Sequence, residues 1–229
     1  DWMEDLMLRT TSPENYDRWV SNDLPFNSPE VLNAMEVYGQ FSRNDDYVAG
    51  GASSVATTFF GDAPKGLFSS PASCMMHRQA SFIPAFFPKK GEEVANGEAD
   101  FFYFPPYASK DLGNPVLGAG TLWTMTKDSP ATRAFFEYMK EASAHEAWMS
   151  QGTFLTAHKG ADLNAYATPA LRKQGEILSN ATTFRFDASD LMPGAIGAGA
   201  FWSEMTAFAN GQDAKTTADN IQAAWDAIK

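Results

Sequence analysis

Four of the motifs in which a serine or threonine is followed by proline constrain the fold of this chain more than any other feature of its sequence. They occur at Ser12-Pro13, Ser28-Pro29, Ser129-Pro130 and Thr168-Pro169. The hydroxyl of the first residue can accept a hydrogen bond from a free amide at the start of a helix. Proline supplies the φ angle that the first helical position needs. Each motif therefore predicts the beginning of a helix.

Apolar residues continue two of these helix starts at helical spacing. They are Val31, Leu32, Met35, Tyr38 and Phe41 after Ser28, and Ala134, Phe135, Tyr138, Met139, Ala142 and Trp148 after Ser129. Residues 2–8 are also predicted to be helical, because Trp2, Leu6 and Arg9 lie about one turn apart. We expect three helices here, with the one after Ser129 running to Trp148.

Stretches with strand character are fewer and shorter than the helices. They are residues 66–69, 100–104 and 117–125, and the last of these is apolar enough to be buried. The irregular segments are 45–64, a loop that enters a helix, and 105–115 and 159–167, which are candidate connections between domains. Interspersed helices and strands predict a mixed α/β fold whose sheets are covered by helices.

Charge and composition exclude several classes of partner. The 229-residue chain carries a formal net charge of −11, which disfavours binding to nucleic acid or to an anionic membrane. No run approaches the roughly 18–20 apolar residues that a membrane-spanning helix needs, so no membrane insertion is expected. No signal peptide is expected either. Cys74 is the single cysteine, so no disulfide within the chain is expected.

The sequence offers little that points to catalysis or to a cofactor. Its three histidines, His77, His145 and His158, form no metal-binding motif, and the GxSxG and GxxxxGK[ST] motifs are absent. We therefore expect no metal and no cofactor. A carbohydrate-active enzyme that uses paired carboxylates stays open as an alternative. Its acids would come from Glu36, Asp45, Asp46, Asp187, Asp190 and Glu204.

Residues 190–202 contain an acid, a proline and three glycines and end on Trp202. The small residues leave little side-chain bulk before a large aromatic ring. A flat apolar ring beside an open space suits the apolar face of a sugar. The alternative is that Trp202 is a core residue at a helix start, since buried aromatic residues usually serve packing.

Two further stretches are candidates for ligand contact. In residues 73–82, apolar residues lead into a group of hydrogen-bonding side chains, His77, Arg78 and Gln79, followed by Phe82. The alternative for this stretch is a solvated segment at a helix start. The residues Gly118, Ala119 and Gly120 lack the rest of a dinucleotide fingerprint, so they are expected to keep the backbone open beside a cleft or a neighbouring helix.

Five stretches in order along the chain resemble the sugar-binding proteins of bacterial ABC importers. This extracellular solute-binding family includes maltose-binding protein, and the likeness is greatest to its α-glucoside-binding members. The stretches are residues 1–9, 65–82, 118–122, 128–148 and 192–211. The chain departs from the family where Gln79-Ala80-Ser81-Phe82 replaces a Gly-Ser-Trp segment. It also departs in length, because the family's chains are longer and begin with a signal peptide and a first lobe.

The resemblance implies the type II fold of periplasmic binding proteins, an α/β fold of two lobes joined by hinge crossings. This chain is similar to the C-terminal part, without most of the first lobe. The implied divisions are residues 1–107 as most of the second lobe, 108–117 as a crossing, 118–160 as a segment that returns to the first lobe, 161–166 as a second crossing and 167–229 as the C-terminal helical part of the second lobe.

The resemblance also implies a function, namely the binding of an α-glucoside or related oligosaccharide in a cleft between the lobes. Trp202 would stack on the sugar, His77, Arg78 and Gln79 would bind hydroxyls, and Phe82 would add a face. Trp2 and Asp1 would lie near one rim, and backbone groups of Gly118, Ala119 and Gly120 would approach from the other lobe. No catalysis is expected.

The implied partners are the oligosaccharide and the membrane permease of an ABC importer. The protein would work in the periplasm as a monomer when full length. A binding module of a sugar sensor is a further alternative, because its binding chemistry would be the same.

Overall fold

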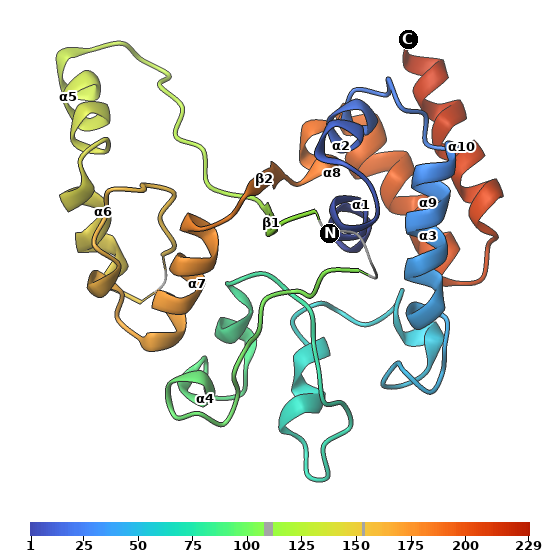
Figure 1. Ribbon diagram of the computed structural model, residues 1–229, viewed down its shortest axis with the longest axis horizontal. Helices are drawn as coiled ribbons and strands as arrows, with labels where there is room; N and C mark the ends of the chain where they lie inside the picture. Colours follow the sequence, from blue (N-terminus) through green and yellow to red (C-terminus); the bar gives the residue numbers. More distant parts are fainter. Residues whose placement is uncertain (108–111, 153) are drawn as a thin grey trace. The chain divides into compact units, whose positions relative to one another are not determined.

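The computed structural model describes residues 1–107, 112–152 and 154–229. The chain divides into two compact units (Figure 1). Unit 1 comprises Asp1–Arg78, Pro105–Ala119 and Thr182–Lys229, and unit 2 comprises Gln79–Phe104 and Gly120–Ala181. Part of the crossing expected at 108–117, residues 108–111, lies outside the described residues. The expected lobe boundaries stay predictions.

Unit 1 contains most of the helices and a small sheet. Its helices are α1 (Trp2–Thr10), α2 (Pro13–Val20), α3 (Pro29–Ser42), α8 (Ala188–Leu191), α9 (Trp202–Ala209) and α10 (Ala214–Ile228), with 3₁₀ turns at Ala52–Ser54 and Ala63–Phe68 and a π-helical segment at Ala195–Phe201. The parallel strands β1 (Pro115–Gly118) and β2 (Thr183–Phe186) pair in register, Pro115 opposite Thr183 and Gly118 opposite Phe186.

Unit 2 is made of short elements. They are α4 (Glu92–Ala95), α5 (Pro130–Tyr138), α6 (Ala142–Met149) and α7 (Pro169–Ser179), with 3₁₀ turns at Ile83–Phe86 and Leu163–Ala165. In its described part the buried apolar side chains are few, namely Phe87, Ala144, Met149 and Tyr166. So small a core stabilises a unit weakly, because burial of apolar surface is the main favourable term in folding.

The helix starts predicted from the Ser/Thr-Pro motifs are confirmed, with proline in the first turn of all four helices. The hydroxyls of Ser12, Ser129 and Thr168 each accept a hydrogen bond of 3.2 Å from the amide three residues on. Ser28 makes no such bond. The helix expected to run from Ser129 to Trp148 is wrong in its length. It breaks between α5 and α6, where the carbonyl of Met139 bonds the His145 ring, at 2.9 Å, instead of a helical amide.

The strand predictions are wrong at most positions. Residues 66–69 lie mainly in a 3₁₀ turn, where the carbonyl of Gly66 accepts from the amide of Ser73, and residues 100–104 form no strand. Of residues 117–125, only 117 and 118 lie in β1, and the rest are exposed rather than buried. A strand needs a partner that satisfies its backbone, and β2 reaches only as far as Gly118. The mixed helix and sheet class stands, while the type II fold stays a prediction.

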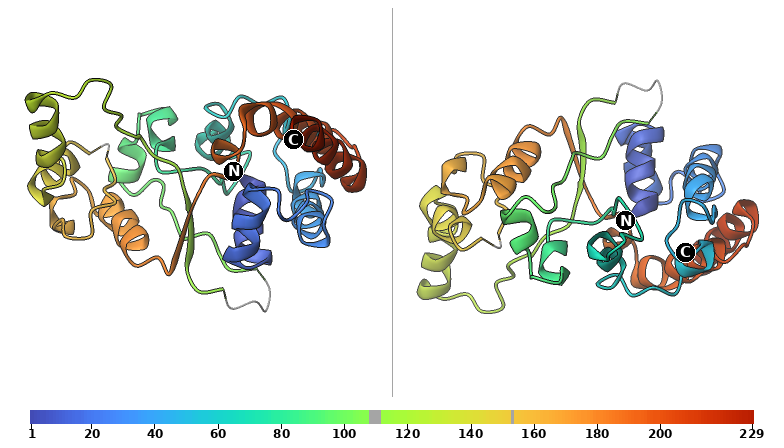
Figure 2. Two further views of the ribbon diagram at one scale, coloured as in Figure 1. Left: turned by 90° about the horizontal axis from the view of Figure 1, so that it is seen from above. Right: turned by 90° about the horizontal axis from the view of Figure 1, so that it is seen from below.

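The core of unit 1 gathers around aromatic side chains from distant parts of the sequence. The ring of Trp19 on α2 lies 5.4 Å from that of Phe26 and 5.6 Å from that of Phe201, measured between centroids. Figures 1 and 2 show α10 alongside α3 and α9, and its residues Ile221 and Trp225 are buried there. Burial of large rings contributes much of a core's stability. Unit 1 is therefore a rigid base for the residues of its surface.

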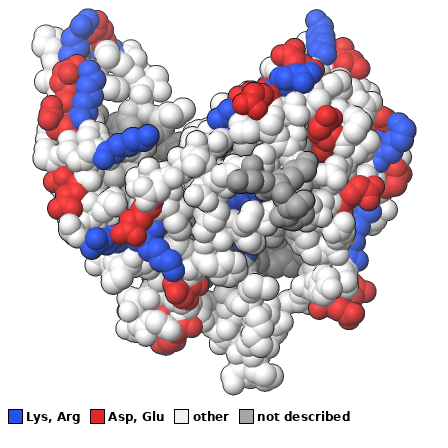
Figure 3. Space-filling model, in the orientation of Figure 1, with Lys and Arg blue, Asp and Glu red and all other residues white. Residues whose placement is uncertain are grey.

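The surface of the protein carries both signs of charge. On the face drawn in Figure 3, acidic and basic side chains are interspersed, and wide areas carry neither. Among the residues that the structure describes, no helix combines the length and the apolar character that crossing a bilayer requires.

Candidate functional site

Helix α1 is unusual because charged residues lie on its buried positions. Glu4, Asp5 and Arg9 are each less than 5% exposed, alongside the apolar Met3, Leu6, Met7 and Leu8. A charge taken out of water is stable only when another group compensates it. The partners of Asp5 and Arg9 therefore define a built polar cluster inside unit 1.

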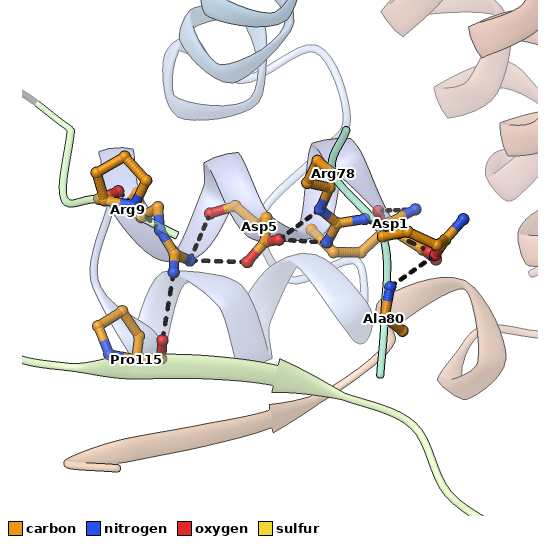
Figure 4. Close-up of polar contacts among 9 residues, drawn as sticks. Asp1, Asp5, Arg9, Arg78, Ala80 and Pro115 are labelled. Atoms are coloured by element: carbon orange, nitrogen blue, oxygen red, sulfur yellow. Dashed lines mark hydrogen bonds and ion pairs between the residues drawn. The ribbon is translucent and has the colours of Figure 1, made fainter. Parts of the chain in front are cut away.

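Asp5 lies between two guanidinium groups (Figure 4). Its Oδ1 accepts from Nη1 of Arg9 at 2.7 Å, and its Oδ2 accepts from Nε of Arg78 at 2.9 Å and also from Nη2 of Arg78. Arg9 in addition donates from Nε to the carbonyl of Pro105 at 3.2 Å and from Nη2 to that of Pro115 at 3.4 Å. The cluster thus joins α1 to three segments that are remote from it in sequence.

Asp1 and Trp2 complete the cluster on the side of Arg78. Nη1 of Arg78 lies 3.5 Å from Oδ2 of Asp1, and its guanidinium carbon lies 5.4 Å from the centre of the Trp2 ring. That separation is within the range of a cation–π contact. The Trp2 ring also packs on that of Phe41, with centroids 4.7 Å apart. Three of the residues predicted from the sequence, Asp1, Trp2 and Arg78, therefore lie together.

His77 precedes the cluster on the chain and is half-buried. Burial lowers the pKa of His77, and the positive charge of Arg78 lowers this pKa further. Its Nε2 is buried and makes no hydrogen bond to the described residues. The hydrogen-bonding capacity of this ring nitrogen is therefore unused among the described residues.

Trp202 is the most exposed of the aromatic rings in unit 1, with 75% of its surface accessible. The interpretation of Trp202 as a core residue is therefore wrong. Its neighbour Phe201 is the core residue instead, buried against Trp19 and Phe26. Successive residues of a helix point about 100° apart, so an anchored Phe201 turns Trp202 outward.

The glycines before Trp202 have different roles. A Cβ on Gly197 would lie 1.9 Å from the carbonyl oxygen of Ser189, whereas one on Gly194 would meet nothing within 4 Å. Gly197 thus permits the close approach of the π-helical segment to α8. This contact fixes the segment that carries Trp202.

The other predicted site residues are divided between the two units. Gly118 ends β1, where its carbonyl accepts from the amide of Asp187 at 2.9 Å and a Cβ would lie 2.5 Å from the Phe184 ring. Ala119 is the last residue of its segment of unit 1, while Gly120, Gln79 and Phe82 belong to unit 2. The side-chain oxygen of Gln79 accepts a hydrogen bond from the amide of Ala80. The centroid of the Phe82 ring lies 6.1 Å from that of Phe86. Their part in ligand binding stays a prediction.

Three of the six acids of the enzymatic alternative have hydrogen-bond partners in the structure. Asp187 accepts from the amide and hydroxyl of Ser189, Glu204 accepts from Gln212 and Asn220, and Asp45 accepts from the amide of Ala52. Glu4 is a further acid whose pKa burial raises, but it is only 1% exposed and out of reach of a substrate. Within the described parts of the chain, no three His, Cys, Asp or Glu side chains are grouped so as to hold a metal ion.

Asp5 and Arg9 were missed by the sequence reasoning. One local signal was available, because an acid and an arginine four residues apart on a helix are neighbours on one face. Their flanking residues are Leu6, Met7 and Leu8, so the pair lies on an apolar helix. Arg78 is 73 positions from Asp5, and no local pattern predicts that contact.

Known proteins establish the class of this chain. It is 59% identical over 230 residues to the alpha-glucosides-binding periplasmic protein AglE of Rhizobium meliloti (strain 1021), an alignment that covers 100% of this chain and 50% of the relative. It is 41% identical over 225 residues to the osmoprotective compounds-binding protein GgtB of Synechocystis sp. (strain ATCC 27184 / PCC 6803 / Kazusa), covering 98% of this chain and 52% of the relative.

The chain is therefore homologous along its length to bacterial binding proteins that capture small solutes. The resemblance to the periplasmic sugar-binding family, seen first in the sequence, is confirmed. The chain spans about half the length of these two relatives. No protein-family model matches the chain, and no solved structure matches it.

Proposed function

We propose that this chain forms part of the solute-binding component of an ABC sugar importer and that it binds an α-glucoside or a related small oligosaccharide. The observation that carries the proposal is the exposed ring of Trp202 on a base fixed by the buried Phe201. A large ring exposed to solvent is a platform for an apolar face, and carbohydrate rings present such a face. The name of one relative describes binding of α-glucosides, which supports this class of ligand, and the name of the other describes binding of osmoprotective compounds.

The polar cluster supplies the other half of the proposed site. Nη1 of Arg78 can donate to a ligand hydroxyl, while the carboxylate of Asp1, which is half-exposed, can accept from the next one. The charges of the cluster balance, since Asp1 and Asp5 carry two negative charges and Arg9 and Arg78 carry two positive ones. Paired charges of this kind can offer hydrogen bonds to a neutral ligand, because neither sign needs a charged ligand to balance it.

The proposed place of action is the periplasm, with the membrane permease of the importer as partner and no catalysis. The sequence-based expectation that residues 118–160 return to another lobe is part of the proposal. Support comes from the exposed rings of Phe135 and Trp148, which both contact the exposed ring of Trp123 in unit 2. Exposed apolar surface of this kind marks an interface.

Calorimetric titration of the full-length protein with maltose, trehalose and sucrose tests this function. We expect saturable binding of at least one of the three sugars, with a change in tryptophan fluorescence. A protein that binds none of them would overturn the proposal. Steady release of reducing sugar from any of them would instead support the carbohydrate-active enzyme.

A further inference from the structure

Asp5 binds two arginines of different kinds. Arg9 lies on the same helix, and its other nitrogens are taken by the carbonyls of Pro105 and Pro115. Arg78 lies within the predicted ligand-contacting stretch, residues 73–82, and its side chain is 17% exposed. Arg9 thus links segments in the interior of unit 1, while Arg78 is partly accessible at its surface.

The hydrogen bonds to Asp5 determine the orientation of Arg78. Nε and Nη2 form one edge of the planar guanidinium, and both donate to Oδ2 of Asp5. A planar group held along one edge is fixed in direction. The remaining nitrogen, Nη1, is turned toward Asp1, whose Oδ2 lies 3.5 Å away. This separation is longer than a normal hydrogen bond, so Nη1 keeps donor capacity for another acceptor.

The same fixation places Arg78 against Trp2. The guanidinium carbon lies 5.4 Å from the centre of the Trp2 ring, and Phe41 packs on that ring as well. With its carboxylate 6% exposed, Asp5 is itself out of reach of a ligand. It contacts the proposed site only through Arg78.

We propose that Asp5 is a positioning residue for ligand binding, which aims Nη1 of Arg78 at a ligand hydroxyl beside Asp1 and Trp2. This inference rests on the proposed sugar-binding function. In this inference, the buried acid Asp5 on α1 sets the orientation of Arg78, a donor that lies 73 positions further along the chain.

The test compares Asp5→Asn, Arg78→Ala and the double variant by calorimetry, with maltose, trehalose and sucrose as probes and the full-length protein as sample. We expect Asp5→Asn to raise Kd about tenfold, the weight of one charge-assisted hydrogen bond. In the Arg78→Ala background the same change should raise Kd no further, because Asp5 acts through Arg78. Losses that add in the double variant, or an unchanged Kd in Asp5→Asn, would overturn the inference.

Asp17→Asn is the matched control. Asp17 also binds both nitrogens of one edge of an arginine, Arg185, at 2.6 and 2.8 Å, but it does so on the exposed surface of α2. The Asp17→Asn variant should leave Kd unchanged. If Asp5→Asn does not fold, Arg78→Lys decides, because a lysine paired with Asp5 has no second nitrogen to aim. The Arg78→Lys variant should bind the sugar as weakly as Arg78→Ala does. Wild-type affinity in Arg78→Lys would contradict the inference.

Different results would overturn the proposed function and the role of Asp5. A wild-type protein that binds none of the three sugars overturns the proposed function, and the role of Asp5 with it. A wild-type protein that binds a sugar as tightly as its Asp5→Asn variant overturns the role of Asp5 alone.

Discussion

Some residues of unit 1 form its buried core, and others lie at its surface. Phe201 and Trp202 are adjacent in sequence, yet one is buried among aromatic rings and the other is 75% exposed. Asp5 and Arg78 show the same division, since the first is buried and the second reaches the surface. Asp5 binds Arg78 directly, whereas Phe201 anchors the backbone next to Trp202, and supporting contacts of this kind position a binding surface.

Replacement of the exposed ring tests the platform directly. We expect Trp202→Ala to weaken sugar binding by about 1.5–3 kcal/mol, or roughly 10- to 100-fold in Kd, with little effect on stability. Tyr47→Ala is the control, because this ring is similarly exposed, at 72%, and lies outside the predicted site. Calorimetry with the sugar that the wild type binds gives the comparison. Equal affinity in the wild type and Trp202→Ala would remove the stacking role.

His77 predicts a pH dependence of stability. Its pKa is lowered in the folded protein by burial and by Arg78, whereas the unfolded chain has the ordinary value of about 6.5. The unfolded state therefore binds the proton more readily, so the contribution of His77 to stability is complete above the unfolded value and is lost as the pH falls below it. Urea unfolding at pH 7.5 and 5.5 should show a larger loss for the wild type than for His77→Gln. Equal losses would contradict the lowered pKa.

At the scale of elements, the close approach of two helical segments decides which glycines can be replaced without a steric clash. The π-helical segment Ala195–Phe201 packs on α8, and the contact point is Gly197, where a Cβ would meet the carbonyl of Ser189. Gly199, two residues on, has its nearest such atom at 3.6 Å, an ordinary contact distance. The sequence shows equivalent glycines, and only the packing distinguishes them.

This difference gives a matched pair of substitutions. Gly197→Ala should destabilise the protein by about 1–3 kcal/mol, because the methyl group forces the segment away from α8. Gly199→Ala should be neutral or should stabilise by up to about 1 kcal/mol, because alanine favours helical backbone more than glycine does. Denaturant unfolding followed by circular dichroism measures both. Similar values for the two variants would show that the close approach is absent in solution.

At the scale of the whole molecule, the two units differ in how well they bury apolar surface. Unit 1 has an extended core of large side chains, whereas the described part of unit 2 leaves Leu122, Trp123 and Tyr138 more than half exposed. The chain spans about half the length of its two relatives. We propose that the exposed apolar surface of unit 2 packs on further polypeptide in the full-length protein.

The 229-residue chain on its own should therefore associate. We expect light scattering to show a mass that rises with concentration, together with binding of a hydrophobic dye. Trp123→Glu should reduce both effects, because a charge at the centre of the aromatic contacts opposes apolar packing. The full-length protein, in which this surface is covered, should bind little dye and remain a monomer. A chain that stays monomeric and binds no dye would contradict the proposed interface.

The sequence alone determined where several helices begin and which residues are candidates for ligand contact. A hydroxyl followed by proline acts within one turn, so the starts at Ser12, Ser129 and Thr168 needed no distant partner. The tertiary structure decided the strands and the polar cluster. A strand at 117–125 required a pairing partner that β2 supplies only to Gly118, and the orientation of Arg78 required Asp5. Both depend on groups far apart in the chain, and no local pattern records which of them will meet.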